Sequence, residues 1–453
     1  MKNFKFQISN SILFRLSAFL LTAYCLLLTA FAQSDGSQQN LTGKAGTFAI
    51  KGAKVVTVSG EIIENGTVVI KDGKILAVGA TVSVPSDAQV IDGKGLSVYP
   101  GMIDAATNLG LSEIQLSADP TVDVAESGDF NPNAKAFIGF NPHTSHVNVT
   151  RVNGVTTVIS TPVGGIISGQ TALMNLNGST QSEMALMPMH SLTVNFPRIS
   201  IFQGFGGGPQ LDFNEAIKQR DRRLEDLKKY FKLAEDYARI KDATAKDSTL
   251  PRQPMDLKME AMIPYIRGEK PIMFTAERDR DIKAVVKFVE EMKVKGIILG
   301  GEEAWKVAEG LNKNNIGVIF TNIYSLPVQD DDAYDYLFSA PAKMQKAGIK
   351  FCISTGNEGQ EVRDLPYHAG LAAGYGGLAP LDALKSVTIY AAQILGVADK
   401  IGSIETGKIA NIVVTDGDLL EPRTNIKYLF INGRLLPLTS RHTELFERFK
   451  DRK

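Results

Sequence analysis

Histidines and carboxylates are the side chains of this sequence that could carry metal or acid–base chemistry. The chain holds only five histidines in 453 residues, and two of them, His143 and His146, form a His-x-x-His pair. This spacing can place two imidazoles on one helical face, where they could bind a metal ion or transfer protons. Two ligands without a third or fourth make a poor zinc site, so the alternative is a pair of loop histidines that hydrogen-bond backbone groups.

A third histidine and a few acidic residues extend this set. We predict His143, His146, Glu277 and His368 as candidate catalytic residues, with Glu302 and Glu358 as further acids. A carboxylate and an imidazole can act as general base and general acid if they share one cavity. Glu277, Arg278 and Asp364 could instead form ion pairs at the barrel mouth, and such structural pairing is the default interpretation over catalysis. Arg278 and Glu302 are also predicted as ligand-binding residues.

A glycine-rich segment, Gly164-Gly165-Ile166-Ile167-Ser168-Gly169-Gln170, could approach a ligand closely. Ser168 is not in a Gly-x-Ser-x-Gly elbow, so the segment does not predict a serine nucleophile. Glycines instead let backbone amides come near a ligand or close a loop. We therefore predict Ser168 and Gln170 as ligand-binding residues.

Composition predicts a large globular protein without an electrostatic preference for polyanions. The chain is 44% hydrophobic, and its 49 basic and 49 acidic residues give a formal net charge of zero. Such a balance offers no general attraction to nucleic acid or to an anionic membrane. A small-molecule ligand is the favoured partner, and pairing with a second copy or a paralogue is possible.

The first 32 residues are typical of a signal peptide. Lys2, Lys5 and Arg15 precede an apolar run from Leu16 to Phe31, and Ala30-Phe31-Ala32 is a small-x-small cleavage pattern. The alternative is an uncleaved anchor, but the run is shorter than the roughly 20 residues that a membrane span needs. We expect export to the periplasm or beyond, with no stable membrane span after cleavage. The mature chain would keep one cysteine, Cys352, and so no intrachain disulfide.

Strand patterns at both ends flank an α/β middle. After a leader at 33–46, residues 47–100 contain β-branched runs and an Asp72-Gly73 hairpin turn, and residues 402–436 repeat this pattern with an Asn432-Gly433 turn. Residues 437–453 form a tail. Between the ends, strands such as 155–160, 271–275, 296–299, 317–320 and 349–354 alternate with amphipathic stretches, which indicates parallel βα units.

A charged insertion interrupts the middle at about 210–264. Leu224, Leu227, Phe231 and Ala234 follow a helical spacing there. Basic and acidic residues are interleaved along the same stretch, so we predict a solvated helix rather than a surface for an anionic partner.

Several motifs resemble the amidohydrolase superfamily, in particular its imidazolonepropionase-related bacterial subgroup. They are Tyr99-Pro100-Gly101-Met102-Ile103-Asp104, Asn141-Pro142-His143, Arg151-Val152-Asn153-Gly154-Val155-Thr156-Thr157, the Gly164–Gln170 segment, Leu365-Pro366-Tyr367-His368-Ala369-Gly370 and Ile394-Leu395-Gly396-Val397-Ala398. The resemblance implies a (β/α)8 TIM-like barrel over 101–401. It also implies a small β-sandwich built from 47–100 and 402–436.

The family's metal-binding positions can be carried over one at a time. The resemblance places Ala106 and Asn108 where the first strand usually has His-x-His, Thr275 and a position near Gly300 at the next two histidines, and Gly356 or Asn357 at the metal-binding aspartate. Alanine, threonine and glycine side chains are not zinc ligands, and amide oxygens are weak ones. Asn108 and Thr275 are therefore predicted as ligand-binding residues and Asn357 as a neutral replacement in the catalytic position.

These substitutions predict a protein without a metal cofactor. The family chemistry is hydrolysis of non-peptide C–N bonds, but we expect a catalytically degenerate, ligand- or partner-binding protein. The alternative is an active hydrolase of a cyclic amide or related bond, with a rebuilt site that could include one divalent metal such as zinc.

Overall fold

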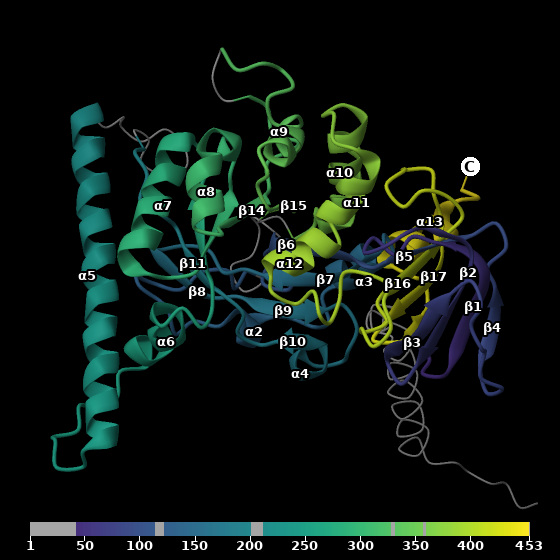
Figure 1. Ribbon diagram of the computed structural model, residues 1–453, viewed down its shortest axis with the longest axis horizontal. Coiled ribbons are helices and arrows are strands. Elements are labelled where there is room, and N and C mark those ends of the chain that lie inside the picture. Colours follow the sequence, from purple (N-terminus) through teal and green to yellow (C-terminus); the bar gives the residue numbers. More distant parts are fainter. Residues whose placement is uncertain (1–41, 114–121, 201–211, 328–330, 357–358, 453) are drawn as a thin grey trace, which may run out of the picture.

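The computed structural model describes residues 42–113, 122–200, 212–327, 331–356 and 359–452. A barrel-like arrangement of strands occupies the centre, a long helix stands at one end, and a separate sheet lies at the other end (Figure 1). The fold is TIM-barrel-like α/β with mixed sheets. Among the helices that the structure describes, none is long and apolar enough to span a bilayer.

The end sheet has eight strands from the two ends of the chain. The first segment supplies β1 (Phe48–Val55), β2 (Ile63–Lys71), β3 (Lys74–Gly79), β4 (Gln89–Asp92) and β5 (Ser97–Pro100), and the second supplies β16 (Ile412–Thr415), β17 (Ile426–Ile431) and β18 (Arg434–Leu436). The strand order is β18-β17-β16-β5-β1-β2-β3, with β4 beside β1. Antiparallel pairing of β5 with β16 joins the segments, with Val98 opposite Val414.

Both sequence-predicted hairpin turns adopt left-handed backbone. Asp72 and Gly73 have φ of 51° and 78°, and Asn432 and Gly433 have φ of 52° and 69°. Aspartate, asparagine and glycine tolerate this region, which matches the twist of the strands that such turns connect. The β2–β3 and β17–β18 hairpins are therefore determined locally.

The central strands form two sheets. One has the order β10-β9-β7-β6 and the other β15-β14-β13-β12-β11-β8. Their bounds are β6 (Met102–Thr107), β7 (Val155–Ser160), β8 (Ile167–Gln170), β9 (Ala172–Asn175), β10 (Ala185–Met187), β11 (Leu192–Val194), β12 (Ile272–Ala276), β13 (Gly296–Gly300), β14 (Gly317–Phe320) and β15 (Phe351–Ile353). The sheets approach each other where Ser354 Oγ, just after β15, contacts the backbone N–H and carbonyl of Ala106 in β6 at 3.0 and 2.9 Å.

The arrangement departs from a regular eightfold βα repeat at β8 and β9. Strand β9 runs antiparallel to β7, and β8 runs antiparallel to β11. Only residues 161–166 separate β7 from β8, too few for the crossover helix that a parallel return needs. The glycine-rich segment is thus largely strand, and Gly169, at φ 140°, packs closely against Ala134.

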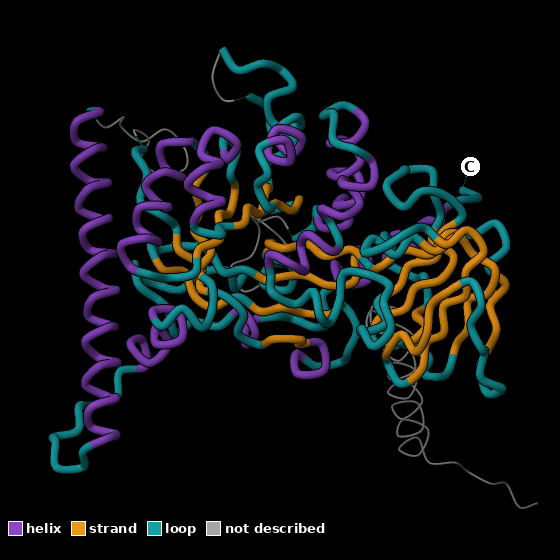
Figure 2. The backbone as a smooth tube through the Cα atoms, viewed as in Figure 1, coloured by secondary structure: helices purple, strands orange, loops and turns teal. Residues whose placement is uncertain are grey.

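Helices cover the central strands (Figure 2). The charged insertion is α5 (Phe213–Lys246) followed by α6 (Leu257–Ile266), and Leu227, Phe231 and Ala234 are buried on one face of α5. The other helical segments are α2 (Ala136–Gly139), α3 (Ser145–Arg151), α4 (Gln181–Met184), α7 (Asp279–Met292), η3 (Ala304–Val307), α8 (Ala308–Lys313), α9 (Ala340–Lys346), η4 (Val362–Asp364), α10 (Leu365–Gly374), α11 (Pro380–Ser386), α12 (Ile389–Ile394) and α13 (Arg441–Phe449).

Candidate functional site

A cavity of about 450 Å³ opens at the carboxyl ends of β12 to β15, the end at which barrel folds usually bind ligands. Its size is within the range of small-molecule sites. Its walls come from the residues that end or follow these strands and from α10: Thr275, Glu277, Leu299, Gly300, Thr321, Asn322, Tyr324, Ser325, Thr355, Gly356, Glu361 and His368.

Glu277 is a strongly perturbed carboxyl group in the wall of this cavity. Its Oε2 atom is buried without a hydrogen-bond partner. Burial and, to a lesser degree, the nearby Glu302 carboxylate raise the pKa of Glu277 to about 7, although the Glu302 backbone N–H, Arg198 and Asn322 act in the opposite direction. A carboxyl group that titrates near neutrality can donate or accept a proton at physiological pH.

His368 lies in the wall of the same cavity, on α10. Its side chain is 3% exposed, and its Nδ1 atom has no hydrogen-bond partner. Burial lowers the pKa of His368 to about 4, so its ring is neutral at pH 7. The ring of Tyr324, at the cavity mouth, meets it edge-on with centroids 4.4 Å apart. The structure therefore brings two predicted catalytic residues, Glu277 and His368, to one cavity.

Asp104 lies beneath this cavity and was not among the residues that we predicted for the site. It is fully buried and accepts hydrogen bonds from the Ser354 hydroxyl and from Thr355 Oγ1, the latter at 2.5 Å. Burial raises the pKa of Asp104 to about 6, against the lowering effect of these hydroxyl groups. The sequence signal was its position at the end of the Tyr99–Asp104 motif, but nothing in the sequence pairs it with Ser354 and Thr355.

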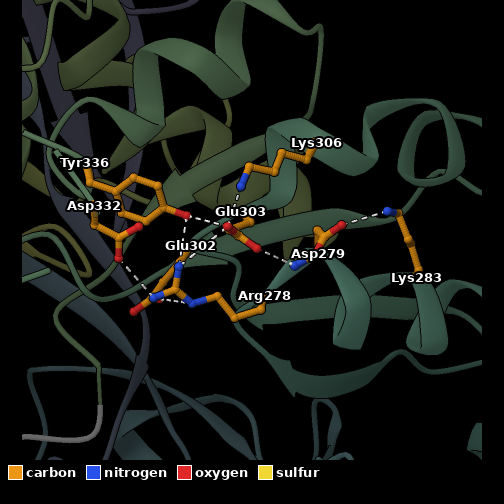
Figure 3. A network of polar contacts seen from close by, with 8 residues as sticks. All are labelled: Arg278, Asp279, Lys283, Glu302, Glu303, Lys306, Asp332 and Tyr336. Carbon is orange, nitrogen blue, oxygen red and sulfur yellow. Dashed lines mark hydrogen bonds and ion pairs between the residues drawn. The ribbon is translucent and has the colours of Figure 1, made fainter. Parts of the chain in front are cut away.

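Arg278 belongs to an ion-pair network beside the cavity (Figure 3). Its guanidinium lies 3.5 Å from Glu302, 3.5 Å from Glu303 and 3.3 Å from Asp332, and it donates to Tyr336 Oη at 3.2 Å. These partners follow β13 and β14 in the chain. The network thus ties together the loops after β12, β13 and β14, with Glu302, Glu303 and Asp332 as the acids that pair with Arg278.

Glu302 and Glu303 have different surroundings in this network. Glu302 is 5% exposed and accepts a hydrogen bond from Asn322 Nδ2 at 3.0 Å, which links the network to the cavity wall. Burial alone would raise the pKa of Glu303, but hydrogen bonds from the Asp279 N–H, Lys306 and Tyr336 hold it at about 2. Arg278 and Glu302 therefore position the cavity wall without lining it.

His143 and His146 do not line the cavity. His143 is exposed at the start of the α3 region, and the ring Nε2 of His146 contacts the Glu113 backbone carbonyl at 3.0 Å. The alternative of a backbone-bonded histidine describes His146, and the structure does not bring His143 or His146 into the cavity that Glu277 lines. Asn357 and Glu358 lie outside the described residues.

The predicted ligand-binding residues likewise lie partly in the cavity wall and partly elsewhere. Thr275 lines the cavity and accepts a hydrogen bond from the Phe196 N–H at 3.2 Å, while Asn108 is nearly buried and accepts one from the Gly359 N–H at 2.6 Å. Ser168 accepts from Asn195 Nδ2 at 3.1 Å, and Gln170 contacts Pro132 and Tyr265. Ser168 and Gln170 lie outside the lining of this cavity because the glycine-rich segment pairs as a strand.

The donors present do not fit a zinc-like ion. In the part of the chain that the structure describes, no group of three or more His, Cys, Asp or Glu side chains is arranged to hold a metal. At the positions that the family resemblance marks, Ala106 and Gly300 offer no donor. Asn108 and Thr275 use their side-chain oxygens to accept backbone hydrogen bonds.

Comparisons with known proteins agree with this architecture. The profile of the amidohydrolase family matches residues 339–436. An imidazolonepropionase from Fusobacterium nucleatum is 42% identical over 80 residues, which is 17% of this chain and 19% of that protein. The match thus spans about a fifth of the curated relative's length.

Solved structures share the fold over most of the chain. An amidohydrolase from Thermotoga maritima superposes with a TM-score of 0.76 at 24% identity, covering 86% of this chain and 99% of that one. An adenosine deaminase from Xanthomonas campestris, solved with bound zinc, has a TM-score of 0.50 at 14% identity over 90% of this chain and 99% of its own. Taken together, these matches support the amidohydrolase superfamily for this chain, and the described residues hold no cluster of three or more His, Cys, Asp or Glu side chains that could bind a metal ion.

Proposed function

We propose that this chain is a metal-independent member of its superfamily that binds a small molecule in the cavity lined by Glu277 and His368. The proposal rests on one observation, which is that the carboxyl group of Glu277 occupies the space beside Gly300. A Cβ atom at this position would lie 2.5 Å from Glu277 Cδ and would overlap its carboxylate oxygens. Where the family resemblance implies a metal-binding histidine, this chain has glycine, and the space beside it is filled by the carboxyl group of Glu277, whose Oε2 atom has no hydrogen-bond partner.

Metal-dependent hydrolysis needs a cation that acidifies water and a carboxylate that takes its proton. The residues at the corresponding positions supply neither in a suitable arrangement, so we derive no step through a metal. Binding requires only a cavity with polar groups in its walls, and Glu277, Asn322 and His368 supply such groups.

A second candidate is a hydrolase with a rebuilt, metal-free site. It is favoured by one observation, the shared cavity of Glu277, with a pKa of about 7, and neutral His368. Glu277 could take a proton from water, but a tetrahedral intermediate also needs donors for its oxyanion. The described lining residues offer only neutral donors such as Asn322, Tyr324 and Ser325 and no lysine or arginine. Because ligand binding needs no such oxyanion site, we favour binding.

The test is the metal content of the purified, tag-free protein, together with its melting temperature with and without zinc. We expect well below one metal ion per chain and no rise in melting temperature with zinc, since a ligand stabilises only a protein that binds it. Stoichiometric zinc that disappears in His143→Ala or His146→Ala would contradict the proposal. Release of product from a cyclic amide such as hydantoin, abolished by Glu277→Gln, would favour the hydrolase instead.

We also propose export, with a mature chain that begins near Gln33. The proposal rests on the basic start, the apolar run to Phe31 and the Ala30-Phe31-Ala32 pattern. N-terminal sequencing of the protein from its native cell checks it, and a chain that keeps Met1 in a cytoplasmic fraction would contradict it.

A further inference from the structure

A second cavity, of about 470 Å³, opens at the amino ends of the central parallel strands. Its lining includes Pro271, Gly296 and Gly317, which precede or begin β12, β13 and β14. The cavity lined by Glu277 lies at the carboxyl ends of the same strands. Because β13 has five residues and a strand rises about 3.3 Å per residue, the two cavities are separate sites roughly 15 Å apart.

Three lysines in the lining of this second cavity stand directly before strands. Lys270 lies two residues before β12, and Lys295 and Lys350 lie one residue before β13 and β15. The Ile272 N–H donates to the Lys295 carbonyl at 2.8 Å. Lys270 and Lys295 are therefore at the ends of adjacent strands, which lie about 5 Å apart. Parallel pairing thus gathers residues from distant parts of the sequence into one basic rim, formed by Lys270, Lys295 and Lys350.

The lining as a whole carries a surplus of positive charge. Glu269 is the only carboxylate among the described residues that line this cavity, and its charge acts on Lys270. His190 also belongs to the lining, but burial lowers its pKa, so the ring is neutral at pH 7. One glutamate against three lysines leaves a surplus of two positive charges.

The ammonium groups of the basic rim are accessible and have neutral partners. Lys270 Nζ donates to the Met189 carbonyl at 2.6 Å, and Lys350 Nζ donates to Asn315 Oδ1 at 2.7 Å. Lys295 and Lys350 are exposed, and Lys270 is partly exposed. Within the described ranges, no carboxylate lies within 4.0 Å of any of these three ammonium groups. Because an ammonium group has three N–H donors, each lysine keeps donors for a ligand.

The deeper part of the cavity is apolar. Val294, Ile297 and Leu395 belong to the lining and are only 7%, 4% and 3% exposed. These side chains lie below the exposed lysines and can pack against a hydrocarbon group. The volume of the cavity is in the range of small-molecule sites.

The geometry points to a small organic dianion, such as a phosphate monoester, as the ligand of this second cavity. Its head group would lie among Lys270, Lys295 and Lys350, and its apolar part would pack on the buried side chains beneath them. A dianion offsets the surplus of two charges through charge-assisted hydrogen bonds, whereas a monoanion leaves one charge and a cation is repelled.

Stability alone does not account for this arrangement. The amino-terminal face of a barrel usually contributes to stability, but neighbouring lysines without an acidic partner repel one another. A bound dianion removes this repulsion. The inference goes beyond the proposed function, because it concerns a different cavity and a different class of ligand.

The test is isothermal titration of the full mature chain at pH 7.5 with phenyl phosphate, inorganic phosphate, benzoate and benzamide. Phenyl phosphate is mainly a dianion at this pH, since the second pKa of a phosphate monoester is about 6. We expect phenyl phosphate to bind most tightly, benzoate and inorganic phosphate at least tenfold more weakly, and benzamide not at all. Added sodium chloride should weaken the binding of phenyl phosphate, because salt screens exposed charges.

Variants locate the site. Lys295→Gln and Lys350→Gln each remove one charge from the basic rim, and each should lower the affinity for phenyl phosphate about tenfold. Both lysines are exposed, so the melting temperature without ligand should stay the same, which separates loss of the site from loss of the fold. Lys232→Gln, at an exposed lysine on α5, is the matched control and should bind like the parent.

Three outcomes would overturn the inference. Equal affinity for benzamide would mean that the cavity does not select an anion, and equal affinity for inorganic phosphate would mean that the apolar part plays no role. Phenyl phosphate binding that is unchanged in both lysine variants, or absent at about 10 mM, would exclude this site. None of these outcomes bears on the metal content that tests the proposed function.

Discussion

The carboxyl group of Glu277 lies against the Cα atom of Gly300, in the space that any side chain at position 300 would occupy. Gly300 also has φ of 109°, a backbone conformation that favours glycine. The two residues end or follow the neighbouring parallel strands β12 and β13, where Ala276 pairs with Gly300. Each therefore restricts the other, and a histidine at position 300 is incompatible with Glu277 in its present place.

Gly300→Ala should lower the free energy of unfolding by about 3 kcal/mol. Positive φ costs a non-glycine residue about 1–2 kcal/mol, and the overlap with Glu277 adds about as much again. The control is Gly407→Ala, at φ 90° with nothing within 4 Å of its Cβ, which should cost only about 1 kcal/mol. Chemical denaturation measures both, and equal losses would mean that Glu277 does not occupy this space.

Glu277→Gln should stabilise the protein increasingly as pH rises. Because the folded-state pKa of Glu277 is raised from 4.5 to about 7, its contribution to stability is fully present below pH 4.5 and is lost as pH rises through 7. The variant should equal the parent near pH 4.5 and exceed it by about 3 kcal/mol at pH 8.

The difference between variant and parent isolates Glu277 from two other buried groups. His368, with its lowered pKa, loses stability as pH falls from about 6.5 toward 4, and Asp104 loses it as pH rises through about 6. Both are present in variant and parent alike. A difference that does not depend on pH would argue against a raised pKa at Glu277.

Arg278→Met should destabilise the protein by about 3 kcal/mol. The substitution removes the guanidinium that pairs with Glu302, which is 5% exposed, and with Asp332. Removing one partner of a buried ion pair is destabilising because the charge of the other partner stays buried. Arg239→Met is the control, since Arg239 and Asp236 form a pair with side chains 78% and 52% exposed. Arg239→Met should change the free energy of unfolding by no more than about 1 kcal/mol. A similar loss of stability in both variants would contradict a special role for the Arg278 network.

Val414→Ala should lower the free energy of unfolding by about 2 kcal/mol, because Val414 lies where strands from the two ends of the chain pair. Val414 and its partner Val98 are both fully buried where β16 pairs with β5. Val90→Ala, at a position 57% exposed on β4, should change stability by less than about 0.5 kcal/mol. Both should unfold in one transition by calorimetry, and a separate transition for the end sheet would indicate an independent domain.

Local patterns were sufficient for several elements. The β-branched run at 155–160 is strand β7 with the same bounds, and the hydrophobic spacing in the insertion predicted the buried face of α5. Such features depend on interactions over a few residues, which the sequence expresses directly.

The lack of a side-chain ligand at positions 106 and 300 follows from residue identity alone, because alanine and glycine have no side-chain donor atom in any fold. The composition of the cavity could not be predicted in this way. Glu277 and His368 are distant in sequence, and Asp104 meets Ser354 across 250 positions, so their meeting depends on how β6, β12, β15 and α10 pack together. The sequence by itself determined which side chains this protein has and which local elements they form. Only the tertiary structure decided that His143 and His146 lie outside the cavity and that burial shifts the pKa of Glu277 and His368, because desolvation depends on the packing around a group rather than on its neighbours in the chain.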